Sequence, residues 1–171
     1  MIQCYKNKTP QVAQNAYVHP SAVLIGDVTV GEHSSIWPNT TLRGDDGSIT
    51  IGKNTSIQDG TVVHLTSDLS STTVEDCVTV GHNVILHGCH VEEGALIGMG
   101  AILLDNVRVG HHSLVGAGAL VLQRMEIPPY SLVLGNPAKV VRQLTEDEIK
   151  NLQSSWEHYV ERTQYYLEHV K

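Results

Sequence analysis

The stretch Val80–Val121 reads VGHNVILHGCHVEEGALIGMGAILLDNVRVGHHSLVGAGALV and places an aliphatic residue at nearly every sixth position. The same spacing continues on the N-terminal side as far as Val18, and glycine directly follows several of the aliphatic residues. A six-residue aliphatic period is typical of a parallel β-helix, in which each repeat is one short strand and one corner. Three repeats make one triangular turn, so residues ~18 apart should stack at a spacing of ~4.8 Å.

The composition is that of an acidic chain with a core of small aliphatic residues. The chain has 171 residues, a formal net charge of −7 and no Phe, which fits a single domain built on stacked Val, Ile and Leu. The acidic balance argues against a nucleic-acid partner. No stretch approaches a membrane span and the N-terminus lacks an apolar leader, so we expect a cytoplasmic protein. Cys4, Cys77 and Cys89 lack the spacing of a disulfide framework and are expected to be reduced thiols.

Three irregular steps interrupt the repeat, and excursions from a rigid scaffold are common places for function. These steps are nine, eleven and five residues long, over 42–51, 63–74 and 86–91. The second step predicts a loop around residues 65–73.

The chain is predicted to have three consecutive parts. They are an N-terminal capping segment, the β-helix domain, and a connection followed by a helix on the outside of the β-helix, at 1–17, 18–126 and 127–171. The helix is predicted from Thr145 to about His169, because Thr145 and Glu148 fit the T-x-x-E capping box and apolar residues then recur at helical spacing.

Three histidines lie beside the irregular steps. His64 and His87 directly follow Val63 and Leu86, two of the periodic aliphatic residues, each of which marks one strand, or rung, of the β-helix. These two rungs are one full turn apart, so the two imidazoles should stack on one face. His82 lies one rung earlier than His87 and therefore on another side of the prism. A three-fold assembly would bring His82 of one copy to His64 and His87 of the next. Three imidazoles with an open fourth position make a catalytic type of zinc site, whereas the alternative is that all three are ordinary surface histidines.

Several motifs of this chain resemble the gamma-class carbonic anhydrases, in particular their shorter bacterial hexapeptide-repeat branch. The likeness covers nearly the whole chain, and the motifs that carry it are Thr41-Leu42-Arg43-Gly44-Asp45, Ser56-Ile57-Gln58-Asp59-Gly60, Val63-His64, Val80-Gly81-His82, Leu86-His87-Gly88-Cys89 and Leu96-Ile97-Gly98-Met99-Gly100-Ala101. The resemblance implies a left-handed β-helix that assembles as a homotrimer with metal sites at its subunit interfaces. It also implies that His64, His82 and His87 are the metal ligands, for zinc or iron(II).

The resemblance further implies roles for residues around those ligands. Gln58 matches a polar residue beside the reacting group, and Asp59 an acidic neighbour in the same network. Arg43 and Asp45 match a pair that braces the subunit interface. Tyr159 is similar to a helix tyrosine near the active site, although its helical spacing fits a packing residue equally well.

The implied activity is the reversible hydration of CO₂ to bicarbonate by metal-bound hydroxide. Two departures from well-known active members bear on its rate. The loop after the first ligand has Asp68 as its single acid and no Glu that could carry protons to buffer, and Ser56 stands where those members have Asn. Asp46, Asp68, His90 or buffer itself are the candidate proton acceptors in this chain.

Three other functions remain open at this point. Many hexapeptide-repeat proteins are acyltransferases that use one histidine as a general base, whereas this chain offers three histidines in matched phase. The second is a trimer in which the metal only joins the subunits, without CO₂ hydration; such a protein would have the same sequence motifs. Metal-assisted hydrolysis of another carbonyl compound, such as a thioester, is the third.

Overall fold

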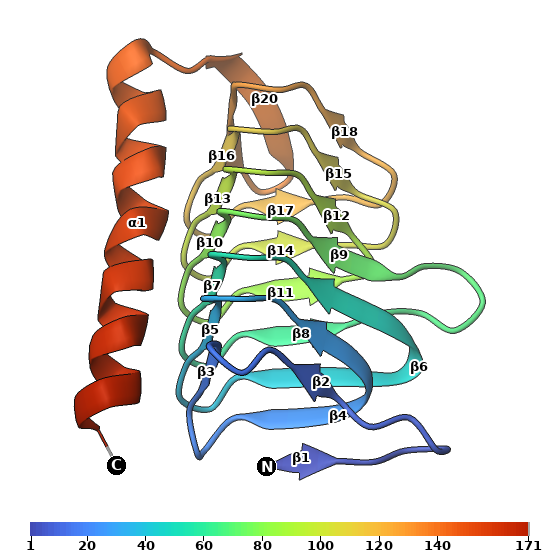
Figure 1. The fold of residues 1–171 in the computed structure, drawn as a ribbon. Helices are drawn as coiled ribbons and strands as arrows, with labels where there is room; N and C mark the ends of the chain where they lie inside the picture. The colour runs from blue at the N-terminus through green and yellow to red at the C-terminus, as the bar shows by residue number, and fades with distance from the viewer. Residues whose placement is uncertain (171) are drawn as a thin grey trace.

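The computed structural model describes residues 1–170; Lys171, the last residue of the predicted C-terminal part, lies outside them. The chain forms a left-handed parallel β-helix with a single C-terminal helix, as predicted (Figure 1). The coils stack into a triangular prism with three faces, and nearly every rung is a strand of two or three residues.

The first face is an eight-stranded sheet that lies beneath the C-terminal helix. Its parallel strands, in order, are β3 (Tyr17–Val18), β5 (Ser35–Ile36), β7 (Ser56–Ile57), β10 (Thr79–Val80), β13 (Leu96–Ile97), β16 (Leu114–Val115) and β19 (Ser131–Gly135). An antiparallel strand, β20 (Ala138–Gln143), pairs with β19 and ends the sheet. The parallel stack therefore extends through β19, which pairs with β16.

The other two faces form one continuous twelve-stranded sheet, because two long strands bend around the corner between them. The long strands are β4 (Val23–Val30) and β6 (Thr41–Ile51). The second face continues with β8 (Val62–His64), β11 (Ile85–His87), β14 (Ile102–Leu103) and β17 (Leu120–Val121). The third face continues with β9 (Thr72–Val74), β12 (His90–Val91), β15 (Arg108–Val109) and β18 (Glu126–Ile127). Two short strands, β1 (Ile2–Gln3) and β2 (Gln11–Val12), pair with β4.

The aliphatic period of the sequence is the core of this prism. On the second face Leu42 pairs with Val63, Val63 with Leu86 and Leu86 with Leu103, and all four side chains are fully buried. The other two faces contribute equivalent columns, such as Ile57 with Val80. Burying one such side chain stabilises a fold by about 1.5–3 kcal/mol, so the stacked columns supply the main driving force.

The irregular steps of the repeat have different structural outcomes. The nine-residue step does not form a separate loop: β6 continues through it, and a register shift between Gly26 and Val28 of β4 accommodates the difference. The eleven-residue step forms the predicted loop, which here spans residues 65–71 between β8 and β9 and leaves the prism (Figure 1). The five-residue step is closed by Gly88, whose φ of +65° lets the chain turn early.

The C-terminal helix α1 (Glu146–His169) begins where the sequence predicts. The Thr145 side chain accepts a hydrogen bond from the Glu148 amide and the Glu148 carboxylate accepts one from the Thr145 amide, so the capping box is formed. The helix runs along the outside of the first face and contacts β3, β5, β7 and β10 (Figure 1). No helix within residues 1–170 is long and apolar enough to cross a membrane.

Candidate metal centre

His64 and His87 lie side by side at the ends of two paired strands. β8 and β11 pair in parallel with His64 opposite His87, and the ring centroids are 5.4 Å apart in an edge-to-face arrangement. The 23-residue separation of the two histidines equals one turn of the β-helix plus the loop that leaves after β8. The matched phase of the two histidines in the sequence therefore corresponds to adjacent positions on the second face.

His82 follows β10 and so belongs to the corner beyond the first face. Its side chain is 42% exposed and its Nδ1 lies 3.0 Å from Oδ2 of Asp59. His82 does not join His64 and His87 within one chain: over the described range 1–170, the single set of three potential metal ligands within 4.8 Å of one another is Asp45, Asp46 and His64.

The three histidines share one chemical feature, which is an oxygen atom at Nδ1. For His64 this atom is the carbonyl oxygen of Arg43 at 2.7 Å, for His87 it is Oδ2 of Asp105 at 3.3 Å, and for His82 it is the Asp59 carboxylate. A carbonyl or carboxylate oxygen only accepts, so Nδ1 is the ring nitrogen that faces this acceptor and Nε2 is the nitrogen left for a metal. An oxygen partner at the second ring nitrogen is the usual setting of a metal-ligating histidine.

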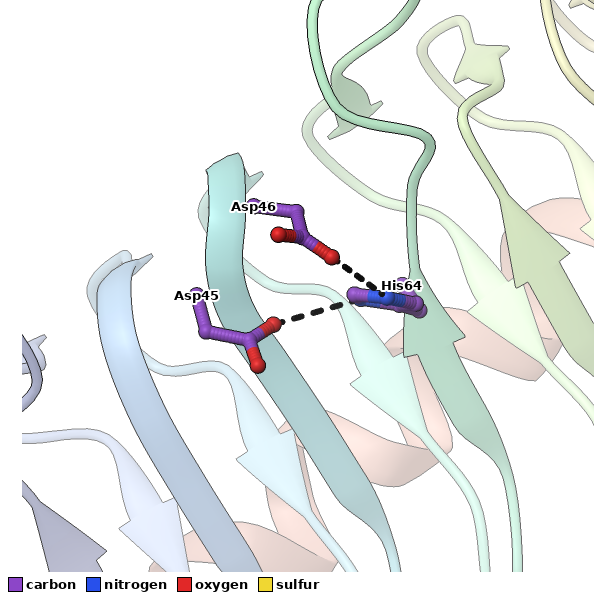
Figure 2. Close-up of side chains that lie close together, drawn as sticks. All are labelled: Asp45, Asp46 and His64. Atoms are coloured by element: carbon purple, nitrogen blue, oxygen red, sulfur yellow. Dashed lines mark ion pairs between the residues drawn. The ribbon is translucent and has the colours of Figure 1, made fainter.

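Two aspartates of β6 face the His64 ring from the neighbouring strand, as Figure 2 shows. Asp45 accepts hydrogen bonds from Nη1 of Arg43 at both of its oxygens, at 2.8 and 2.7 Å. Burial would raise the pKa of Asp45, but the hydrogen bonds and charge of Arg43 outweigh it and hold the pKa below its usual value. Oδ2 of Asp46 lies 3.5 Å from Nε2 of His64, and the Asp46 side chain is 48% exposed.

Gln58 directly follows β7 of the first face, and Tyr159 lies on helix α1. Gln58 is buried directly after β7, and its backbone N–H donates to the Val80 carbonyl. Its side-chain amide makes no hydrogen bond within residues 1–170. The Tyr159 ring packs edge-on against Trp37 at 5.8 Å. Burial raises the pKa of Tyr159, the nearby Arg162 guanidinium opposes that rise, and the Asp59 carboxylate adds to it. Tyr159 therefore makes the packing contact that its helical spacing indicates.

Asp105 is the residue of this region that the sequence analysis missed. Ile85 of β11 pairs with Ile102 of β14, an offset of 17 residues, so Asp105, eighteen residues after His87, lies one residue beyond the position stacked on His87, and the stacking rule alone does not find it. It accepts hydrogen bonds from Ser70 at 2.6 Å and from Thr66 at 3.1 Å. Burial would raise the pKa of Asp105, but these hydroxyls and the neighbouring His87 together lower it, so the group is a carboxylate at neutral pH.

Cys89, although it is close to His87 in the sequence, belongs to the core. It is 1% exposed, and burial raises the pKa of its thiol to about 12. A thiol that keeps its proton at neutral pH is a poor metal ligand, and Cys89 therefore acts as a small hydrophobic residue. All three cysteines are free thiols in the structure.

The repeat, the prism and the histidine arrangement define a hexapeptide-repeat protein. The family description "Bacterial transferase hexapeptide (six repeats)" matches residues 9–44 and 88–123. A carbonic anhydrase from Geobacillus kaustophilus is 52% identical over 166 residues, which cover 97% of this chain and 91% of that protein. The mitochondrial gamma carbonic anhydrase 2 of Arabidopsis thaliana is 44% identical over 92% of this chain and 59% of its own length. The chain belongs to the gamma-class carbonic anhydrase-like family.

A solved structure adds a second functional name to the same fold. A Bacillus cereus protein described as an acetyltransferase superimposes with a TM-score of 0.95, is 45% identical, and covers 96% of this chain and 95% of its own. The comparison supports the fold closely. It also shows that proteins with this fold are described both as carbonic anhydrases and as acetyltransferases.

Proposed function

We propose that this protein hydrates CO₂ reversibly to bicarbonate at a metal ion held between copies of the chain. The observation that carries the proposal is the shared arrangement of the three histidines, each with an oxygen at Nδ1, so that Nε2 is the nitrogen left for a metal. Membership of a family that includes proteins named carbonic anhydrases supports the same reaction. His64, His82 and His87 are the proposed ligands.

The donor set fits the metal that the family implies. Three neutral imidazoles suit zinc or iron(II), and a site with three protein ligands keeps one position open for water or substrate. Zinc in such a site supplies a nucleophile from water at neutral pH, because it lowers the pKa of water from about 15.7 to about 7. The Arg43 carbonyl at Nδ1 of His64 and the Asp59 carboxylate at Nδ1 of His82 would orient these two rings toward the metal.

Asp46 is the proposed acceptor of the proton that hydration releases. Its carboxylate is nearest the metal-binding nitrogen of His64 and is half exposed, so a proton held there can pass to buffer. His90 is a weaker candidate because its Nε2 lies 2.6 Å from the Glu75 carboxylate, which already occupies it. Asp46 thus replaces the glutamate-bearing loop that this chain lacks.

Gln58 and the Arg43–Asp45 pair are proposed to position the reactants rather than to exchange protons. The side-chain amide of Gln58 offers a donor and an acceptor, which suits the oxygens of CO₂ and bicarbonate. The two-point contact between Arg43 and Asp45 fixes the strand that carries Asp46 and braces the contact with the next copy.

The complete site requires more than one copy, and we propose a homotrimer. The second face, which carries His64 and His87, has an outward column of aliphatic side chains, Val62, Ile85, Ile102 and Leu120, of which Val62 and Ile85 are 41% and 38% exposed. An apolar column beside polar ligands is suited to contact with another subunit. Closed three-fold symmetry would give each interface one His82 and one His64–His87 pair.

The test combines metal content with CO₂ hydration measured by stopped-flow pH indicator. The wild type should hold about one zinc or iron per chain and accelerate hydration. His82→Ala should lose both, although His64 and His87 remain, and His158→Ala on the exposed helix surface should change neither. A metal-free wild-type trimer would refute the proposal and favour acyl transfer. Metal without CO₂ turnover would instead favour a metal that only joins subunits, or hydrolysis of another carbonyl compound.

A further inference from the structure

Loop 65–71 is tied to one buried carboxylate, Asp105. The hydroxyls of Thr66 and Ser70 donate to its two oxygens, at 3.1 and 2.6 Å, from positions thirty-nine and thirty-five residues earlier in the chain. Asp105 itself is 6% exposed. Oδ2 of Asp105, which accepts from Thr66, also lies 3.3 Å from Nδ1 of His87. The loop, the carboxylate and the histidine therefore form one continuous hydrogen-bonded chain.

The other end of the loop is tied to the strand that carries His64. The hydroxyl of Thr72 donates to the His64 carbonyl at 2.6 Å and accepts from the Gly88 amide at 2.9 Å. The Gly88 amide also donates to the His64 carbonyl at 3.0 Å. Both ends of loop 65–71 thus brace the pair of strands on which the two adjacent histidines sit.

Gly88 leaves the space in which this network forms. A Cβ at Gly88 would collide with the Ser70 hydroxyl and with an Asp105 oxygen. The close approach of loop and carboxylate therefore depends on the absence of a side chain at this position. Glycine at position 88 therefore makes room for both the Ser70 hydroxyl and the Asp105 carboxylate.

We propose that Asp105 is a positioning residue for His87, and that Thr66 and Ser70 of loop 65–71 hold it in place. Asp105 does not touch the reacting atoms. It holds the ring through Nδ1 and leaves Nε2 as the nitrogen for the metal, which sets the affinity of the site for metal. This inference rests on the proposed function, because it concerns one of the three proposed ligands.

The test measures zinc affinity by competition with a chromophoric chelator at constant pH, on trimers of confirmed size. Asp105→Ala should weaken binding about 10–100-fold. Asp105→Asn keeps an oxygen acceptor of the same shape and should recover part of that loss. Ser70→Ala should weaken binding less than Asp105→Ala, whereas Asp68→Asn changes an exposed carboxylate in the same loop and should leave affinity unchanged.

A second readout separates positioning from general stability. In the cobalt(II)-substituted protein, the visible absorption bands report ligand geometry, and they should shift in Asp105→Ala and in Ser70→Ala but not in Asp68→Asn. Wild-type affinity and spectrum in both Asp105→Ala and Ser70→Ala would overturn the role of Asp105 and leave the proposed function standing. If Asp105→Ala does not fold, the Ser70→Ala result decides alone. A wild type that binds no metal would overturn both proposals.

Discussion

Gly88→Ala is the substitution that tests the brace around His87 most sharply. Gly88 has a φ of +65°, and an alanine forced into this left-handed conformation costs roughly 1–2 kcal/mol. The new Cβ would also collide with Ser70 and Asp105 and separate them. A hydrogen bond to a charged group contributes about 1.5–3 kcal/mol, so we expect a total loss of about 2.5–5 kcal/mol in the free energy of unfolding.

Gly118→Ala is the matched control, because Gly118 has a φ of +68° and no atom within 4 Å of an added Cβ. It carries the backbone strain without the collision, so its loss should be only about 1–2 kcal/mol. The assay is equilibrium unfolding in urea at one protein concentration, since oligomers gain apparent stability with concentration. Equal losses in the two variants would refute the argument that Gly88 makes room for the Asp105 network.

Three further predictions concern separate features of the molecule. At pH 8 a thiol reagent should label the exposed Cys4 in the folded protein and reach Cys89 only after unfolding, because the Cys89 thiol is buried with a pKa of about 12; rapid labelling of Cys89 would contradict its place in the core. Arg142 and the Thr145 amide lower the pKa of Glu148 from 4.5 to about 2. The stability that Glu148 adds should therefore be complete above about pH 4.5 and disappear as pH falls through about 2. The thermal unfolding temperatures of the wild type and of Glu148→Gln should converge over that interval. A constant difference between them would argue against the pairing. Gln58→Ala should keep the metal but slow CO₂ hydration by about tenfold or more, and unchanged turnover would remove Gln58 from the mechanism.

The sequence determines most of this fold because each coil repeats the same physical solution. A buried aliphatic residue at every sixth position gives the columns that include Leu42, Val63 and Leu86, and these columns fix the register. The capping box at Thr145 and Glu148 fixes the start of the helix. The nine-residue step was less predictable, because a bent continuous strand and a separate insertion have the same length in the sequence.

The candidate site was predictable only in part. The adjacency of His64 and His87 follows from phase alone, since the two rungs are one turn apart. Asp105 lies one residue beyond the position stacked on His87, and its buried contacts with Thr66 and Ser70 depend on how loop 65–71 folds back, which no periodic pattern encodes. The approach of Asp46 to His64 depends in the same way on the bend in β6.

The most direct test of the central claim is metal binding by mixed trimers of two inactive variants. His82→Ala and His64→Ala should each bind no metal as pure trimers, because every interface then lacks one ligand. When the two are co-expressed in equal amounts and mix at random, roughly a quarter of the interfaces receive His82 from one variant and intact His64 and His87 from the other. We expect about 0.25 metal ions per chain in the mixed trimers, and no metal in such trimers, or full metal in either pure variant, would contradict an interface site.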